Sequence, residues 1–295
     1  MKKILTIACI AVALFGCSTD VDAKKKEACF QMYSVRELIG NPEAFAQNHK
    51  DVLAKLAAMG YTSTEAANYD NGKLYGLSPE DYKKAIEASG LEVLSSHVGH
   101  NLSDQELASG DFSEALKWWD KCIDCHKRAG MKYIVNPGVN FPKTLKEANI
   151  ICKYMNAVGE KVNAAGMKFG YHNHSYEFGQ VEGKMWYDYM IEHTDADKVF
   201  FEMDVYWTVR GQASPVDYFN KYPGRFLLLH IKDHRELGQS GMVGFDAIFN
   251  NADKAGMKAL VVELEGSTKP SIMDGMKESI DYIKEAKFVK ASYSK

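Results

Sequence analysis

AGMKFGYHNH, residues 165–174, joins the end of an amphipathic helix to an apolar strand that finishes in polar residues. Gly166 can supply the left-handed conformation that turns a helix sharply into the next strand. The same junction, a glycine between a helical run and an apolar strand, recurs at Met59-Gly60-Tyr61, Ser89-Gly90-Leu91, Ala129-Gly130-Met131 and Ala255-Gly256-Met257. One helix–strand unit is therefore reused along the chain.

Short apolar runs alternate with longer amphipathic segments from residue 28 onward, as in a parallel sheet with crossover helices. Besides the strand of the opening stretch, strands are expected at 29–35, 61–67, 91–98, 133–136, 198–204, 226–232 and 259–265. Helices are expected at 43–59, from about 78, and at 113–129, 145–165, 185–193, 215–220, 245–255 and 272–286. Eight strand–helix units predict an α/β fold, a single-domain (β/α)8 TIM barrel, with a doubly wound open sheet as the alternative.

The N-terminus has the order of a processing signal. Lys2 and Lys3 precede an apolar run over residues 4–15, and Leu14-Phe15-Gly16-Cys17 follows. This order resembles a bacterial lipoprotein signal, which implies cleavage before Cys17 and lipidation of that residue; a short uncleaved anchor or a chance cysteine is the alternative. We expect a signal peptide at 1–16, a tether at 17–27 and a catalytic barrel at 28–295, exported and held by lipid on the periplasmic or cell-surface side of a membrane.

Composition narrows the class of partner. The chain is 46% hydrophobic and 25% charged, as in an ordinary globular protein, and its formal charge of −3 gives no basic surface for nucleic acid. No Gly-x-Gly-x-x-Gly follows the first strand and no Walker A sequence is present, so nothing indicates a dinucleotide or nucleoside triphosphate. A small-molecule partner is expected.

Polar residues follow the apolar starts of the predicted strands, where TIM barrels carry their active sites. In chain order they are Tyr33, Arg36, Glu65, His97, His172, His174, Glu177, Glu202, Asp204, His230, Lys232, Glu263 and Glu265. Charges at the ends of buried strands must be paired or metal-bound. Histidine with several carboxylates suits Mn²⁺, Mg²⁺, Co²⁺ or Zn²⁺, and a salt-bridged ring around the barrel mouth is the structural alternative.

Six short motifs fall in the order found in one family. They are Gln31–Arg36, Gly60-Tyr61 with Glu65, Tyr171–His174, Met203–Trp207, His230–Asp233 and Val262–Glu265. These motifs resemble the xylose-isomerase-like TIM barrels called sugar phosphate isomerases/epimerases. The resemblance implies one divalent metal ion at the barrel mouth, with Asp204 and His230 as ligands and Glu265 or Glu263 as the carboxylate of the last strand.

The fourth ligand is where this chain departs from the family pattern. Many members have Glu at the end of the fifth strand, so His172, His174 or Glu177 must take its place. We predict His172, Asp204, His230 and Glu265 as metal ligands. The predicted catalytic residues are Glu177, His174, Lys232 and Glu263, and the predicted substrate-binding residues are Tyr33, Arg36, Glu65, His97 and Trp207.

A metal that chelates the carbonyl and the neighbouring hydroxyl of a keto-sugar acidifies the carbon between them. The resemblance therefore predicts a metal-dependent sugar isomerase or epimerase; the alternative is a lyase or dehydratase that eliminates from a 3-keto-glycoside or keto-inositol. An exported enzyme would meet unphosphorylated sugars. The competing classes are a sugar-binding lipoprotein without chemistry, an abasic-site endonuclease, and a c-type haem protein because of the sequence CIDCH at residues 122–126.

Overall fold

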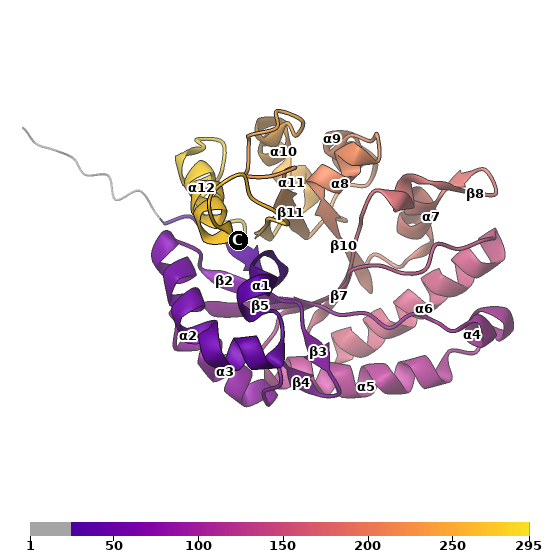
Figure 1. The fold of residues 1–295 in the computed structure, drawn as a ribbon. Coiled ribbons are helices and arrows are strands. Elements are labelled where there is room, and N and C mark those ends of the chain that lie inside the picture. Colours follow the sequence, from indigo (N-terminus) through magenta and orange to yellow (C-terminus); the bar gives the residue numbers. More distant parts are fainter. Residues whose placement is uncertain (1–24, 295) are drawn as a thin grey trace, which may run out of the picture.

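The protein is a closed barrel of eight parallel strands, seen in a computed structural model that describes residues 25–294 (Figure 1). In chain order the strands are β1 (Cys29–Gln31), β2 (Ser63–Ala66), β5 (Glu92–His97), β6 (Tyr133–Asn136), β7 (Lys168–His172), β10 (Val199–Asp204), β11 (Leu228–Lys232) and β12 (Ala259–Glu263). Their spatial order follows the chain around the barrel, and β1 closes it by pairing with both β2 and β12. The predicted TIM barrel is confirmed, and the open sheet is wrong.

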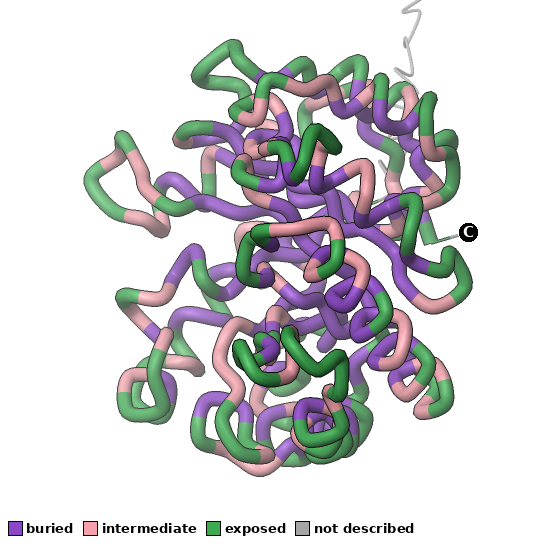
Figure 2. Tube along the Cα trace, turned by 90° about the vertical axis from the view of Figure 1, so that its right-hand side faces the viewer, coloured by how far each residue is buried: buried purple, intermediate pink, exposed green. Residues whose placement is uncertain are grey.

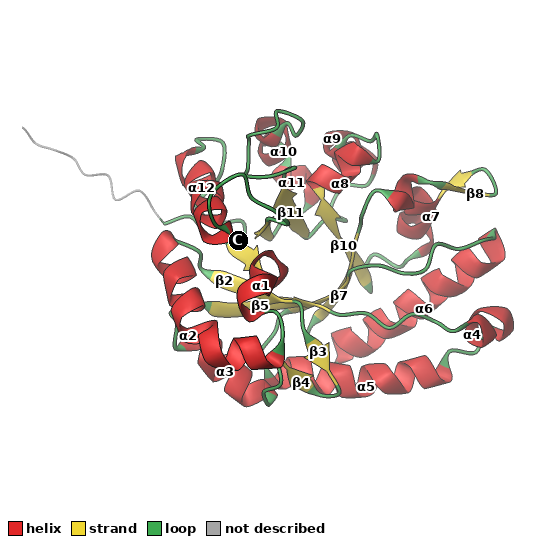
Figure 3. Cartoon of the chain, viewed as in Figure 1, coloured by secondary structure: helices red, strands yellow, loops and turns green. Residues whose placement is uncertain are grey.

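Helices form a ring around the strands (Figure 3). They are α2 (Pro42–Met59), α3 (Pro79–Glu87), α5 (Ser113–Arg128), α6 (Leu145–Ala164), α7 (Trp186–His193), α9 (Pro215–Lys221), α10 (Phe245–Asn250), α11 (Ala252–Ala255) and α12 (Ile272–Glu285). Polar side chains such as Ser78 and Thr144 accept backbone N–H groups at the helix starts. All five junction glycines have positive φ, for example +119° at Gly60 and +87° at Gly166, as predicted.

The hydrophobic core lies mainly between the strands and the helices, and Figure 2 shows buried segments in the interior of the molecule and exposed segments at its edges. Phe30, Tyr171 and Phe201 extend from the strands into this layer, and Trp119 and Trp186 enter it from the helices; all five are fully buried. Alternate strand residues therefore face outward into the core, and their neighbours face the barrel interior.

Shorter elements interrupt the loops. They are the 3-10 helices η1 (Met32–Val35) and η2 (Tyr176–Phe178), the helices α1 (Arg36–Ile39), α4 (Asp104–Ser109) and α8 (Val205–Arg210), and the two-residue strands β3 (Tyr69–Asp70), β4 (Lys73–Leu74), β8 (Gln180–Val181) and β9 (Lys184–Met185). The sequence pattern predicted none of them, because each is too short to show a period.

The first and last strands end earlier than predicted. The Gln31 side chain accepts the N–H of Tyr33 at 2.9 Å and turns the chain into η1. In the last strand the N–H of Leu264 donates to Ser34 Oγ at 3.0 Å instead of to a neighbouring strand, which places Glu265 beyond the end of β12. The helix predicted at 245–255 is also divided at Asn251, whose side chain bonds the Ala247 carbonyl and competes with the backbone.

The Cys-x-x-Cys-His sequence lies on α5 with its side chains in the core. Cys122, Cys125 and His126 are each at most 2% exposed, and the thiols are free. A haem attached here would need the space that other core side chains occupy around α5, so this packing contradicts the haem alternative.

The predicted signal peptide, most of the tether and Cys17 lie outside the described residues. Within residues 25–294, no helix has the length and apolar character needed to cross a membrane.

Candidate metal centre and substrate cavity

The polar residues predicted at the strand ends gather at the C-terminal end of the barrel. A cavity of about 320 Å³ opens there, and it is lined by Tyr33, Ala67, His97, Pro137, His172, His174, Glu263 and Glu265. Another cavity, of about 450 Å³, lies at the opposite end around Cys29 and Tyr133. None of the predicted site residues lines that second cavity, so the chemistry belongs to the C-terminal end.

Three of the predicted residues form a group that could hold a metal ion. Donor atoms of Asp204, His230 and Glu263 all lie within 4.8 Å of one another. The strand register brings these residues together. Asp204 of β10 lies opposite His230 of β11, and Lys232, two residues after His230, lies opposite Glu263 of β12. His230 Nδ1 is 4.0 Å from Asp204 Oδ2 and 3.5 Å from Glu263 Oε2. Glu263, rather than Glu265, is therefore the last-strand carboxylate beside His230.

The group has the features expected of a metal site. Asp204 Oδ2 and His230 Nδ1 are fully buried and have no hydrogen-bond partner, although buried polar atoms are almost always paired. Burial raises the pKa of Asp204 to about 7 despite the charges of Lys232 and His230. The other oxygen, Oδ1, accepts the Trp207 N–H at 2.7 Å and so fixes the carboxylate at the start of α8. Mixed imidazole and carboxylate donors fit Mn²⁺, Co²⁺ or Zn²⁺.

His172 offers a fourth donor atom next to this group. Its Nε2 lies 4.0 Å from Asp204 Oδ2, and its ring also lines the cavity. His174 also lines the cavity and is only partly buried, whereas Glu177 does not line it. Of the three residues considered for the fourth ligand, His172 is the one placed beside Asp204.

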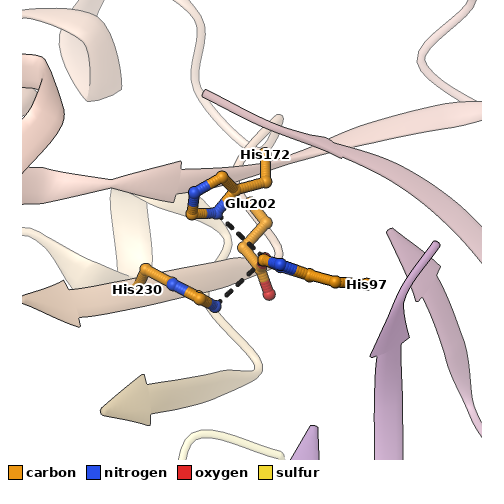
Figure 4. A group of neighbouring side chains, drawn as sticks. All are labelled: His97, His172, Glu202 and His230. Atoms are coloured by element: carbon orange, nitrogen blue, oxygen red, sulfur yellow. Dashed lines mark hydrogen bonds and ion pairs between the residues drawn. The ribbon is translucent and has the colours of Figure 1, made fainter. Parts of the chain in front are cut away.

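Figure 4 shows a second group of ionisable residues, His97, His172, Glu202 and His230, which shares His230 with the first group. His97 Nε2 is 2.6 Å from Glu202 Oε2, and His230 Nε2 is 2.7 Å from Glu65 Oε1 and 3.2 Å from Glu202 Oε2. The third imidazole, His172, points Nδ1 toward the same Glu202 oxygen at 3.3 Å. The ligand atoms of His97, His172, Glu202 and His230 thus also lie within 4.8 Å of one another.

The two buried carboxylates of this inner group titrate in opposite directions. Burial acts to raise the pKa of Glu65, but His97, His230 and hydrogen bonds outweigh it and hold the pKa below its ordinary value. Burial and the negative charge of Glu65 raise the pKa of Glu202. Burial likewise acts to lower the pKa of His230, but the surrounding carboxylates raise it well above its usual range. His172, in contrast, has its pKa lowered by burial and by the neighbouring imidazoles.

Lys232 places a buried cation beside the outer group. Its Nζ is 3.4 Å from Glu263 and 3.3 Å from Glu265, and the Trp207 ring lies 5.9 Å away. Burial acts to lower its pKa, but Glu263, Asp204 and Glu265 outweigh burial and raise the pKa. The ammonium therefore stays charged.

His174 and Glu177 occupy different environments. His174 lines the cavity, with its ring between Tyr176 and Trp207, and burial lowers its pKa to about 4, so it is neutral near pH 7. Glu177 is fully buried and accepts the Tyr171 hydroxyl at 2.8 Å and the His174 N–H at 2.9 Å. Burial raises the pKa of Glu177 to about 7. This carboxyl group holds the loop that carries His174 and does not line the cavity.

The predicted substrate-binding residues divide between the rim and the interior. Tyr33 is 45% exposed at the rim, and the Arg36 guanidinium lies 4.3 Å from the centre of its ring and donates to the Glu265 carbonyl. Trp207 lies on α8 and packs near His174. His97 lines the cavity floor, whereas Glu65 lies wholly beneath it.

Sequence reasoning gave no role to Glu202, Ser95 or Asn173. Ser95 donates to Glu65 at 2.6 Å, and the Asn173 side-chain carbonyl accepts the Asp204 N–H at 3.2 Å, which joins the ends of β7 and β10. The sequence did carry a signal for Glu202, because it stands two residues before Asp204 and so on the same face of the strand. Serine and asparagine offered no comparable signal.

Residues 53–286 match the family described as xylose isomerase-like TIM barrel. The chain belongs to this family. A solved structure of a sugar phosphate isomerase/epimerase from Parabacteroides distasonis ATCC 8503 is 34% identical, with a TM-score of 0.80 over 90% of this chain and 96% of that chain. The structure of an L-ribulose 3-epimerase is 16% identical, with a TM-score of 0.66 over 88% of this chain and 93% of that chain, and shares the fold.

Two curated relatives are inosose dehydratases. The protein of Geobacillus kaustophilus (strain HTA426) is 23% identical over 196 residues, which are 62% of this chain and 61% of that protein. The protein of Clostridium botulinum (strain Alaska E43 / Type E3) is 24% identical over 209 residues, 67% of this chain and 66% of that protein. The matches thus span less than two thirds of each relative. The proteins of this family that resemble the chain are thus sugar isomerases, epimerases and dehydratases.

Proposed function

We propose that this chain is a divalent-metal-dependent sugar isomerase or epimerase that removes and returns a proton next to the carbonyl of a keto-sugar. The observation that carries the proposal is a pair of buried atoms without hydrogen-bond partners, Asp204 Oδ2 and His230 Nδ1, which lie beside the cavity residue Glu263. Leaving such atoms unpaired costs about 1–3 kcal/mol each. A bound cation would remove that cost.

Asp204, His230, Glu263 and His172 would hold the ion. Glu265, the ligand first predicted, lies beyond the strand end with its side chain 38% exposed, and we place it instead among the groups that contact substrate. A divalent ion at this position supplies Lewis acidity, which polarises a substrate carbonyl and acidifies the adjacent C–H bond.

Residues in and next to the cavity fit the proton transfer. His174 is neutral near pH 7 and can accept a proton from the substrate carbon. The Lys232 ammonium can stabilise the negative charge that develops on a substrate oxygen, because it is buried and fixed between Glu263 and Glu265. Tyr33 lines the cavity and Trp207 packs beside the cavity residue His174, so both rings could stack on the apolar faces of a sugar.

A second candidate function is elimination, as in a dehydratase or lyase. The two curated relatives are inosose dehydratases, and an elimination begins with the same proton transfer. A keto-inositol would then lose water, and a 3-keto-glycoside would lose its alcohol. The same residues would serve in both reactions.

Incubation of the Mn²⁺-loaded protein in D₂O with keto-sugars, keto-inositols and 3-keto-glycosides tests the proposal. NMR of the mixture separates the outcomes: deuterium at the α-carbon with a new stereoisomer indicates epimerisation, and loss of water or alcohol indicates elimination. If none of these substrates exchanges an α-proton, both candidate functions are contradicted.

We further propose that the protein is exported and lipid-anchored through Cys17. The basic residues, the apolar run and the small residue before Cys17 support this. In that compartment the substrate would be an unphosphorylated sugar or glycoside. Expression with a radiolabelled fatty acid should label the wild-type chain and leave Cys17→Ala unlabelled; equal absence of label in both would contradict the anchor.

A further inference from the structure

Two buried carboxylates lie directly behind the imidazoles proposed as metal ligands. His230 points Nδ1 toward Asp204 and Nε2 toward Glu65, at 4.0 Å and 2.7 Å. His172 has the same arrangement with the nitrogens exchanged, since Nε2 is 4.0 Å from Asp204 and Nδ1 is 3.3 Å from Glu202. Each ring therefore has one nitrogen facing the outer group and one facing an inner carboxylate.

This arrangement decides which ring nitrogen carries the proton. An ionised carboxylate accepts hydrogen bonds and donates none, so a neutral imidazole placed against it keeps its N–H on that side. Once a metal ion replaces the proton on the outer nitrogen, the remaining proton of His230 lies on Nε2 and that of His172 on Nδ1. The lone pairs of the outer nitrogens are left free for a metal ion, which binds only unprotonated nitrogen.

Glu65 is held in place independently of the histidines. Gln31 Nε2 donates to Oε1 at 2.8 Å, and Ser95 Oγ donates to Oε2 at 2.6 Å. These donors come from the strands on either side of β2, so three adjacent strands fix the carboxylate and favour its ionised form. A side chain held this rigidly can orient the imidazole against it.

We propose that Glu65 and Glu202 are positioning residues that fix the tautomers of His230 and His172 and thereby raise the metal affinity of the outer group. This inference rests on the metal site proposed above. Removal of such a partner typically weakens metal binding by about 10–100-fold. Glu65 should have the larger effect, because its hydrogen bond to His230 is short, whereas Glu202 lies at 3.3 Å from His172 without a hydrogen bond.

The first test is Mn²⁺ binding measured by calorimetry. We expect Glu65→Gln, which keeps the shape but removes the charge, to weaken binding by at least about 10-fold, and Glu202→Gln to weaken it less. Glu236→Gln is the matched control, since Glu236 is another fully buried carboxylate whose partners are Ser267 and Thr268. Equal Mn²⁺ affinity in all three variants and the wild type would overturn the inference.

The second test needs no variant and so does not depend on a substitution folding. In wild-type protein labelled with ¹⁵N and loaded with Zn²⁺, long-range ¹H–¹⁵N correlation spectra distinguish the metal-bound nitrogen of each histidine from the protonated one. We expect His230 to be bound through Nδ1 and protonated at Nε2. Binding through Nε2 would overturn the inference while leaving the proposed function intact. If the wild type takes up neither Mn²⁺ nor Zn²⁺, both fail.

Discussion

Two clusters of buried histidine in this chain have opposite properties. In the first, which we call the helix cluster, Cys122, Cys125 and His126 are adjacent on α5 and pack into the apolar layer. The His126 ring donates from Nδ1 to the Cys122 carbonyl at 2.7 Å, the Cys122 Sγ lies 3.4 Å from the same nitrogen, and burial lowers the pKa of His126 to about 4. The ring is neutral and behaves as a core residue.

In the second, which we call the barrel cluster, three histidines from different strands lie beside carboxylates. Its members are His97, His172, His230, Glu65, Glu202, Asp204 and Glu263. His230 lies against Glu65, Glu202 and Glu263, which raise its pKa well above the ordinary value although it is just as buried. Burial alone is thus the same in both clusters, and the carboxylates make the difference. The residues adjacent in sequence form part of the hydrophobic core, whereas the residues that the strand register brings together form the candidate metal site.

The largest effect is expected for removal of a ligand from the barrel cluster. Asp204→Asn keeps the acceptor for the Trp207 N–H but removes the charge from the atom that faces His230. Mn²⁺ affinity should fall by more than the roughly 10–100-fold typical of an outer-shell partner, and turnover should fall with it. Calorimetry and the D₂O exchange assay measure the two quantities, with circular dichroism as the check on folding. Full Mn²⁺ binding by this variant would remove Asp204 from the site.

A smaller effect is expected when the proposed base is removed and the ligands stay. His174→Gln should lower kcat by roughly 10²-fold, which is the lower range for a general base, with Mn²⁺ affinity within a few-fold of the wild type. His193→Gln is the control, because His193 is an exposed histidine stacked on Tyr189 at the outer surface. Unchanged α-proton exchange in His174→Gln would transfer the role of base to another cavity residue.

The fold and much of the barrel cluster could be predicted from the sequence. The junction glycines and alternating patterns predicted the barrel, and the position of Asp204, His230 and Lys232 at strand ends predicted that they lie close together, as they do around Glu263. The sequence could not predict which residue of Glu263 and Glu265 faces His230, because that depends on the Ser34 hydroxyl accepting the Leu264 N–H. Such a contact joins residues 230 positions apart and leaves no local pattern.

The direction of Glu177 was equally hidden. Its spacing after His172 and His174 predicted a catalytic group or ligand, but η2 turns the side chain inward to the Tyr171 hydroxyl. Conversely, the inner position of Glu202 follows from simple alternation with Asp204, and only its function was missed. The fold and the residues at the strand ends can therefore be predicted from the hydrophobic periodicity. The contacts of Glu65 and Glu202 behind the proposed ligands cannot, because they are long-range hydrogen bonds.

The helix cluster predicts a pH effect on stability. The pKa of His126 is about 4 in the folded chain against about 6.5 when unfolded. Between these values the unfolded chain binds more protons, so stability is complete above about pH 6.5 and is lost as the pH falls toward 4, by at most about 3 kcal/mol. Urea unfolding at pH 7.5 and pH 5 should show a smaller loss for His126→Leu than for the wild type. An identical loss in the two proteins would place the titrating group elsewhere.

The smallest effect is expected for the cysteines of the helix cluster. In Cys122→Ala/Cys125→Ala each substitution removes one buried sulfur and leaves a small cavity, which should cost roughly 1 kcal/mol per site in the free energy of unfolding. Mn²⁺ binding and turnover should stay at wild-type values, because neither thiol approaches the barrel cavity. The wild-type chain expressed with a haem-attachment system should show no Soret band. A Soret band that the double variant loses would mean that α5 opens to expose both thiols, and the comparison between the two clusters would then be reversed.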